Sequence, residues 1–150
     1  MAEAKLEIRN SKLASARGAA VNDFTDLKAW QLARELRQEI YRIVRKFPTD
    51  ERHVLVSQAR RAALSITANI AEGFGRFSFQ ENIQFCRQAR GSAFEVRDHL
   101  TAALDAGYIA QGEWQKLDAL AQRAIQVLNG YIRSTRELQR RKEKPTSKEG

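Results

Sequence analysis

The sequence predicts an all-α protein, specifically an antiparallel up-down-up-down four-helix bundle. Apolar residues recur every three or four positions through four long segments, which is the spacing of one face of an α-helix. Proline and glycine separate these segments, so the connections between them are short. No β-branched run alternates with polar residues as a strand requires. Four helices joined by short connections pack antiparallel to their neighbours.

The composition indicates one domain with a basic surface. The chain has 150 residues, 43% of them hydrophobic, and a formal net charge of +8. This balance is compatible with a nucleic acid, an acidic protein or an anionic membrane surface as partner. The single cysteine, Cys86, excludes an intrachain disulfide and fits a reducing cytosol. Because no apolar run is long enough to span a bilayer or to act as a secretory signal, we expect a cytoplasmic protein.

The bundle is expected to cover residues 24–138. Residues 1–23 are small, polar and basic with weak periodicity, and we expect a flexible N-terminal arm there. Residues 139–150 are expected to form a basic disordered tail, because the apolar pattern fades and bases dominate.

The first expected helix starts near residue 25 and ends before Pro48, whose ring disfavours helical backbone in the residue before it. The second starts after Thr49 or Asp50 and runs to Glu72. Gly73 is placed as the left-handed cap that commonly ends a helix.

The third expected helix starts at a capping box formed by Ser78 and Glu81, and ends at Gly107. The fourth follows Gly112. Gly91 lies inside the third helix, where glycine costs about 1 kcal/mol relative to alanine. We therefore predict that Gly91 marks a close helix–helix contact.

Three polar residues share one face of the second helix: Ser65, Asn69 and Glu72 are spaced i, i+4 and i+7. They form either an anion or substrate site or a structural polar network. We favour the network, with Arg61 or Arg90 opposite Glu72.

The arrangements that enzymes need are missing. Cys86 and His99 lie thirteen positions apart on one expected helix, about 20 Å at the helical rise, and cannot act as a nucleophile–base pair within one subunit. His53 and His99 lack metal-ligand spacing, and the Glu-x-x-His motif of di-iron bundles is absent from the sequence. We expect no catalytic residue, no metal and no cofactor, and therefore not an enzyme.

The positive charge is concentrated in two blocks. Residues 52–97 hold seven arginines and three acids, and residues 133–150 hold seven bases and three acids, so each block carries +4. Concentrated bases favour a polyanion partner that is bound through its backbone and shape. The residues predicted to contact phosphate are Arg60, Arg61, Arg76, Arg87, Arg90, Arg140, Arg141 and Lys142.

Several stretches resemble the four-helix-bundle family of 23S rRNA intervening-sequence proteins, whose relatives include the accessory variability proteins of diversity-generating retroelements. The matching stretches are residues 24–31 (FTDLKAWQ), 58–63 (QARRAA), 65–66, 69–73 (NIAEG) with Arg76, 91–92 and 128–130 (LNG). The resemblance implies an up-down bundle assembled as a ring of five with a basic surface. In the retroelement branch it also implies contact with nucleic acid and a reverse transcriptase. The chain departs from the family at Thr67, where proline is usual.

Aromatic residues indicate self-association. Six of them exceed what one narrow bundle seam can bury, and exposed aromatic patches mark interfaces. They are Trp30, Tyr41, Phe74, Phe77, Phe79 and Phe94. With the resemblance, this predicts a cyclic homopentamer that binds nucleic acid, with RNA favoured over DNA and no readout of base sequence. The alternative is a protein-interaction adaptor that docks an acidic protein partner.

Overall fold

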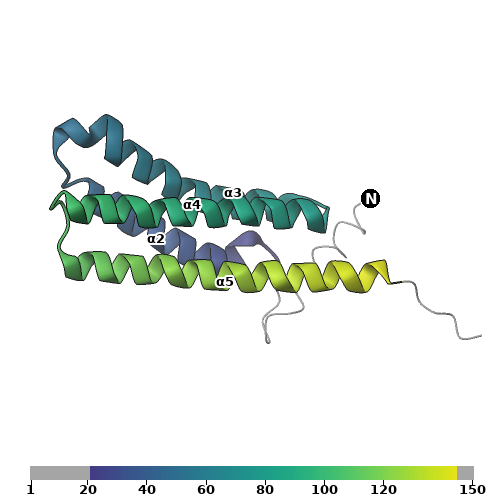
Figure 1. The fold of residues 1–150 in the computed structure, drawn as a ribbon. Helices are drawn as coiled ribbons and strands as arrows, with labels where there is room; N and C mark the ends of the chain where they lie inside the picture. The colour runs from purple at the N-terminus through teal and green to yellow at the C-terminus, as the bar shows by residue number, and fades with distance from the viewer. Residues whose placement is uncertain (1–20, 145–150) are drawn as a thin grey trace, which may run out of the picture.

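The computed structural model describes residues 21–144 and confirms the four-helix bundle (Figure 1). The helices are α2 (Lys28–Val44), α3 (Ser57–Gly75), α4 (Phe79–Asp105) and α5 (Gln111–Glu143). Within the described residues, every regular element is helical.

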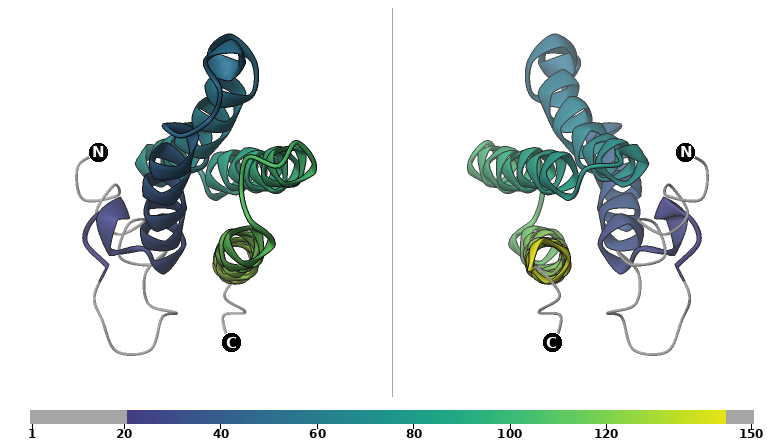
Figure 2. Two further views of the ribbon diagram at one scale, coloured as in Figure 1. Left: turned by 90° about the vertical axis from the view of Figure 1, so that its left-hand side faces the viewer. Right: turned by 90° about the vertical axis from the view of Figure 1, so that its right-hand side faces the viewer.

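Successive helices run antiparallel and lie side by side. Helix α3 packs on α2 and α4, and α5 packs on α4 and on α2, which closes the bundle. Figure 2 looks along the bundle from either end. In both Figures 1 and 2 the first turns of α3 rise away from the other three helices, whereas its last turns lie beside α4.

The core follows the predicted apolar stripes. Its large side chains are almost fully buried, and each contributes about 1.5–3 kcal/mol relative to an exposed one. They are Leu36, Ile40, Ile66, Ile70, Val96, Leu100, Leu117 and Leu128. Among the six aromatics expected to exceed the core, Phe74 is in fact buried at 2% exposure. Phe77 and Phe94 are each 50% exposed.

The first helix begins differently from the prediction. A 3₁₀ turn over Phe24–Asp26 precedes α2. The carboxylate of Asp26 accepts hydrogen bonds from the backbone N–H groups of Asn22 and Asp23, each at 3.0 Å. Asp26 therefore organises this entry, because a charged acceptor reaches two unsatisfied backbone donors.

The second helix also has an irregular start. A 3₁₀ turn, Thr49–Glu51, leads into a π turn, Arg52–Val56, before regular α-helix begins. The Glu51 carboxylate accepts from the Leu55 backbone N–H at 3.2 Å and from the Tyr108 hydroxyl at 2.9 Å. The hydrogen bond between Tyr108 and Glu51 links the segment before α3 to the loop between α4 and α5.

The prediction for Gly73 is wrong, and the close contact predicted at Gly91 is not formed within the described chain. Gly73 is not a left-handed cap, since among the described residues only Gly107 has a positive φ, at +76°. Helix α3 continues to Gly75, and Gly73 is needed because a Cβ there would lie 2.8 Å from Asn82 Oδ1 and 3.0 Å from Phe85 Cβ. Gly91 is exposed, and a Cβ added to it meets no atom of the described chain within 4 Å. It therefore marks no close crossing inside the chain.

The predicted domain limits shift at both ends. Val21 is buried at 7% exposure, so the packed part reaches back beyond residue 24. Helix α5 runs to Glu143, where the prediction placed a disordered tail from residue 139. Buried Ile132 and Thr135 extend its packed face, and Gln139 donates to Glu143 one turn later at 2.9 Å. The remainder of the predicted arm and tail, residues 1–20 and 145–150, lies outside the described residues.

Candidate nucleic-acid interface

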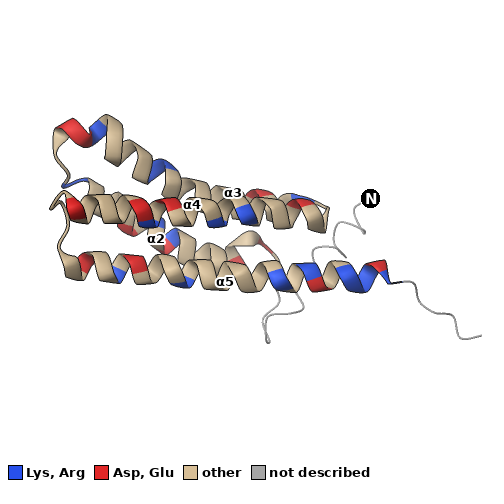
Figure 3. Ribbon diagram, in the orientation of Figure 1, with Lys and Arg blue, Asp and Glu red and all other residues tan. Residues whose placement is uncertain are grey.

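The predicted phosphate-binding residues do not form one surface. Arg60 and Arg61 lie near the start of α3, whereas Arg76 follows its end. Sixteen helical positions separate Arg60 from Arg76, about 24 Å at the helical rise. The end of α3 lies beside the start of α4, and Figure 3 shows basic residues gathered along the last turns of α5 at this same end of the bundle.

The pair near the start of α3 makes local contacts. The Arg60 guanidinium lies over the Tyr41 ring, 4.8 Å from its centroid. Arg61 donates to the side chain of Gln58 at 2.7 Å. Both arginines are exposed, and neither joins an ion pair within the described residues.

Arg76 and Arg90 have protein partners. Arg76 pairs with Glu72 one turn earlier at 2.7 Å, and both side chains are about half exposed. A surface pair of this kind contributes about 0–1 kcal/mol, but it neutralises part of the arginine's charge. Arg90 donates to the Asn129 side chain at 2.8 Å and thereby links α4 to α5. Arg90 is therefore better placed to align two helices than to contact phosphate.

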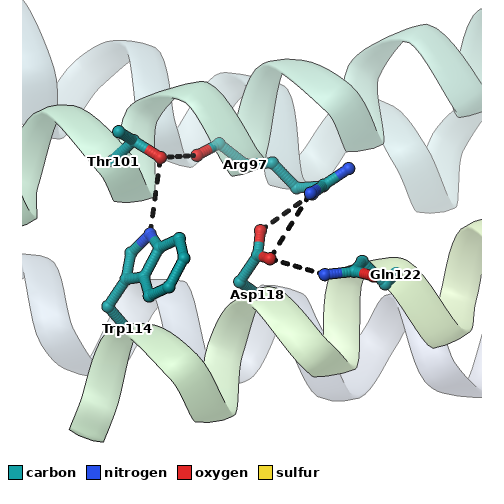
Figure 4. Close-up of polar contacts among 5 residues, drawn as sticks. All are labelled: Arg97, Thr101, Trp114, Asp118 and Gln122. Carbon is teal, nitrogen blue, oxygen red and sulfur yellow. Dashed lines mark hydrogen bonds and ion pairs between the residues drawn. The ribbon is translucent and has the colours of Figure 1, made fainter. Parts of the chain in front are cut away.

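Arg97, which contributes to the charge of the first basic block, is also engaged. Its guanidinium binds the buried Asp118 carboxylate at 2.8 and 3.4 Å, and Gln122 donates to the same carboxylate at 2.7 Å (Figure 4). Nearby, the Trp114 indole N–H donates to Thr101 at 3.4 Å. These contacts hold α4 against α5 near the α4–α5 loop, so Arg97 is used in folding.

Three arginines converge in a groove between the start of α4 and the end of α5. We name it the arginine groove. It has a volume of about 380 Å³ and is lined by Gln80, Ile83, Gln84, Arg87, Arg136, Gln139, Arg140 and Glu143. Within residues 21–144, the guanidinium groups of Arg87, Arg136 and Arg140 make no hydrogen bond or ion pair. The structure thus brings two predicted residues together and adds Arg136, which the prediction omitted.

Further bases surround the groove. Arg141 and Lys142 follow Arg140 and are exposed, and the Lys142 amine lies over the Phe79 ring, 5.5 Å from its centroid. Residues 133–144 hold six bases and two acids, a net charge of +4. We call the arginine groove together with Arg141 and Lys142 the basic end of the bundle.

The predicted polar network is present in altered form. The hydroxyls of Ser65 and Ser92 are hydrogen-bonded at 2.8 Å, and the Asn69 amide donates to the Ser65 carbonyl and hydroxyl at 2.9 and 3.0 Å. Ser92, on α4, was not predicted as a member. Glu72 lies outside the network, because its carboxylate pairs with Arg76 rather than with Arg61 or Arg90. The contacts join α3 to α4, as a structural role requires.

A second buried cluster, not predicted from the sequence, lies next to the arginine groove. The fully buried Asn82 amide donates to the Tyr131 hydroxyl at 3.0 Å and thereby links α4 to α5. Burial raises the pKa of Tyr131 to about 12, because the phenolate is disfavoured away from water. The Cys86 thiol donates to Asn82 Oδ1 at 3.8 Å and is buried in the core. We name Gly73, Asn82 and Tyr131 the three-helix junction.

In residues 21–144, no three His, Cys, Asp or Glu side chains gather as metal ligands would. No helix of this part is both long and apolar enough to cross a bilayer.

Residues 25–130 match the model of a protein family described as 23S rRNA-intervening sequence protein. A similar fold occurs in the crystal structure of a protein with unknown function from the S23 ribosomal protein family of Bacteroides thetaiotaomicron. The two share 21% identity with a TM-score of 0.61, over 69% of this chain and 97% of that chain. This likeness shows the fold alone. No curated protein matches the chain. The relation to retroelement proteins stays a prediction.

Proposed function

The chain belongs to the 23S rRNA-intervening sequence protein family, and from this premise we propose that it is a non-enzymatic, homo-oligomeric helical bundle that binds nucleic acid. RNA is favoured over DNA because the family description names a ribosomal RNA. Binding is to phosphate and shape without readout of base sequence, since guanidinium groups contact phosphates whatever the base. The protein acts in the cytoplasm and uses no cofactor.

The basic end carries this proposal. Three arginine side chains from two helices line one groove without a protein partner among the described residues, and two further bases follow. Like charges held close together repel each other, and a polyanion relieves that repulsion. Each phosphate neutralised also releases condensed counterions, which adds to the affinity. Arg60 and Arg61 supply a weaker second contact.

The salt dependence of RNA binding tests the proposal. Fluorescence anisotropy with a labelled RNA of mixed sequence should show tight binding at low salt and a steep, log-linear loss as salt rises. A second RNA of scrambled sequence should bind equally well. Weak, salt-insensitive binding to both RNAs would reject the proposal.

Self-assembly is supported by an exposed face of small and apolar residues. Leu64 and Ala68 on α3 and Gly91 and Phe94 on α4 are all exposed, and the Ser65–Ser92 hydrogen bond holds the two helices together at this level. Small residues let a helix from another copy approach closely, while Leu64 and Phe94 supply apolar area. We name these four residues the α3–α4 face and propose that it contacts a second copy in a cyclic homopentamer.

Light scattering coupled to size exclusion tests assembly. A ring of five would have five times the mass of the 17.1 kDa chain. A mass of one chain across micromolar concentrations would reject self-assembly, and another multiple would reject the pentamer alone.

The alternative function is an adaptor that docks an acidic protein, such as a reverse transcriptase. The arginine groove is compatible with it, because guanidinium forks bind carboxylates in the same bidentate manner as phosphates. Purification of the tagged protein from its own cells distinguishes the two. One co-purifying protein without RNA supports the adaptor, and co-purifying RNA supports the first proposal.

A further inference from the structure

The arginine groove is built differently from a uniformly charged surface. Arg136 and Arg140 are spaced i, i+4 and so share one face of α5, while Arg87 reaches the groove from α4. The groove thus offers guanidinium donors from two sides. Each guanidinium presents a planar fork that matches the oxygens of a phosphate.

The backbone at Arg87 and Arg136 is held in place by buried neighbours in the sequence. Arg136 directly follows Thr135, which is 1% exposed, and Arg87 directly follows Cys86, which is also 1% exposed. The Asn82–Tyr131 hydrogen bond at 3.0 Å holds the two helices together beside the groove. A site whose supporting residues are packed and hydrogen-bonded loses less entropy on binding.

The remaining lining indicates what kind of phosphate the groove accepts. Gln80, Gln84 and Gln139 carry side-chain amides, which both donate and accept hydrogen bonds as sugar hydroxyls and base edges require. Ile83 adds apolar surface. The Glu143 carboxylate also lines the groove, and the Gln139 amide donates to it at 2.9 Å, so the charged lining sums to three bases and one acid, or +2.

The size of the groove limits its occupant. Its volume of about 380 Å³ lies near the small end of ligand pockets, which span roughly 300–1,000 Å³. Paired bases are stacked inside a duplex, whereas an unpaired nucleotide can be turned out into a pocket of this kind and stack on an arginine plane. We infer that the arginine groove is a phosphate-binding site that holds one unpaired nucleotide of an RNA strand. This inference rests on the proposed function and assigns the contact between the protein and RNA to one site.

Three forms of the 150-residue chain test the inference. The groove variant is Arg87→Gln/Arg136→Gln/Arg140→Gln. The matched control is Arg45→Gln/Arg52→Gln/Arg123→Gln, which removes the same charge from exposed arginines outside the groove. Melting curves and light scattering first establish that each variant is folded and assembled as the wild type. If the groove variant fails this check, Arg140→Gln replaces it and is compared with Arg123→Gln, which removes the same charge from an exposed position outside the groove.

Anisotropy is measured with a short single-stranded RNA and with the same strand paired to its complement. The groove variant should lose about tenfold or more in affinity for the single strand relative to the control, since bonds to charged groups are lost. The two variants should lose affinity for the duplex equally. Equal losses on the single strand would overturn the groove site while leaving salt-dependent RNA binding, and so the proposed function, in place.

A small probe separates the two hypotheses if the wild type fails to bind RNA. Uridine monophosphate is titrated while the side-chain N–H signals of Gln80, Gln84 and Gln139, which line the groove in all three forms, are followed by nuclear magnetic resonance. Shifts that saturate in the wild type and the control but vanish in the groove variant support the phosphate site even though the proposed function has failed. Absence of saturable shifts in the wild type overturns the site.

Discussion

At the scale of single residues, the basic end depends on the three-helix junction behind it. Gly73 lets α3 approach α4, and Asn82 links α4 to α5 through Tyr131. None of these residues carries charge, yet they decide how the arginines of the two helices are spaced. Changes in the junction should therefore alter both stability and RNA binding.

Gly73→Ala should destabilise the fold by roughly 1–3 kcal/mol through overpacking. The added methyl would lie 3.0 Å from the Asn82 carbonyl oxygen and 3.0 Å from Phe85 Cβ, neither of which is the end of a flexible side chain. Urea unfolding measures the change. The control is Gly75→Ala, where a Cβ meets nothing within 4 Å in the described chain. Equal stability of the two variants would contradict the close-approach role of Gly73.

The Tyr131 phenol should make stability sensitive to alkaline pH. Its pKa is raised by burial from 10.0 to about 12 in the folded chain, so the unfolded chain releases this proton first. The protonated Tyr131 phenol therefore makes its full contribution to the free energy of unfolding below pH 10, and this contribution is lost as pH rises toward 12. Denaturant unfolding across this window should show a smaller pH-dependent loss in Tyr131→Phe than in the wild type.

The same variant has a second effect at neutral pH. Tyr131→Phe leaves the buried Asn82 amide without its acceptor, which should cost roughly 1–3 kcal/mol. A pH dependence identical to that of the wild type would show that Tyr131 ionises as readily in the folded chain as in the unfolded one.

At the scale of elements, the helices could be predicted because their apolar period is long and regular. The ends could not, because tertiary contacts decide them. Residues 139–143 read as a charged tail, yet α5 continues through them because Ile132 and Thr135 keep its preceding turns packed. The start of α3 contains a π turn that no local pattern announces.

The two helical glycines also show what the sequence could not predict. A glycine inside a helix indicates that a side chain does not fit at that position, but it does not show which neighbouring helix excludes the side chain. Gly73 meets α4 within the chain, whereas Gly91 faces outward. The arginine groove could not be predicted from the sequence alone, because its prediction requires knowing that the start of α4 lies beside the end of α5. The spacing of Arg136 and Arg140, one helical turn apart, was the available sequence signal for the missed residue.

Gly91→Leu separates folding from assembly. Inside one chain the position is open and exposed, so the thermal stability of an isolated chain should not fall. If the α3–α4 face contacts a second copy, the larger side chain should block close approach and shift the mass toward single chains. Light scattering measures the shift. Gly112→Leu, at another exposed open glycine, should leave the mass unchanged. Full assembly of Gly91→Leu would place the interface elsewhere.

At the scale of the whole molecule, the charge is distributed in a way that favours one end. The start of α3 carries Arg60 and Arg61, and the opposite end carries the arginine groove with Arg141 and Lys142. A cyclic assembly would repeat each group around a ring, and repeated weak contacts raise the effective affinity for one long polyanion. Binding should therefore be compared only among variants with the same assembly.

Two double variants decide which group dominates. Arg60→Ala/Arg61→Ala and Arg141→Ala/Lys142→Ala each lower the net charge from +8 to +6, so a purely global charge effect would weaken RNA binding equally. We expect the second pair to lose more affinity, because these bases adjoin the arginine groove, whereas Arg60 lies over Tyr41 and Arg61 bonds Gln58. Each lost single-strand phosphate contact should lower the log–log salt slope by about 0.7.

Comparison of the log–log salt slopes of the two double variants shows which basic group makes the main contact with RNA. Anisotropy titrations over a range of salt concentrations give each slope, after melting curves establish that both variants are folded. A larger loss in Arg60→Ala/Arg61→Ala would move the main contact to the start of α3. Equal losses would mean that net charge alone governs binding. If RNA runs across the basic end, the salt slope should be shallower for Arg141→Ala/Lys142→Ala and close to the wild-type slope for the other pair. The reason is that only the phosphates that touch the mutated bases regain their counterions.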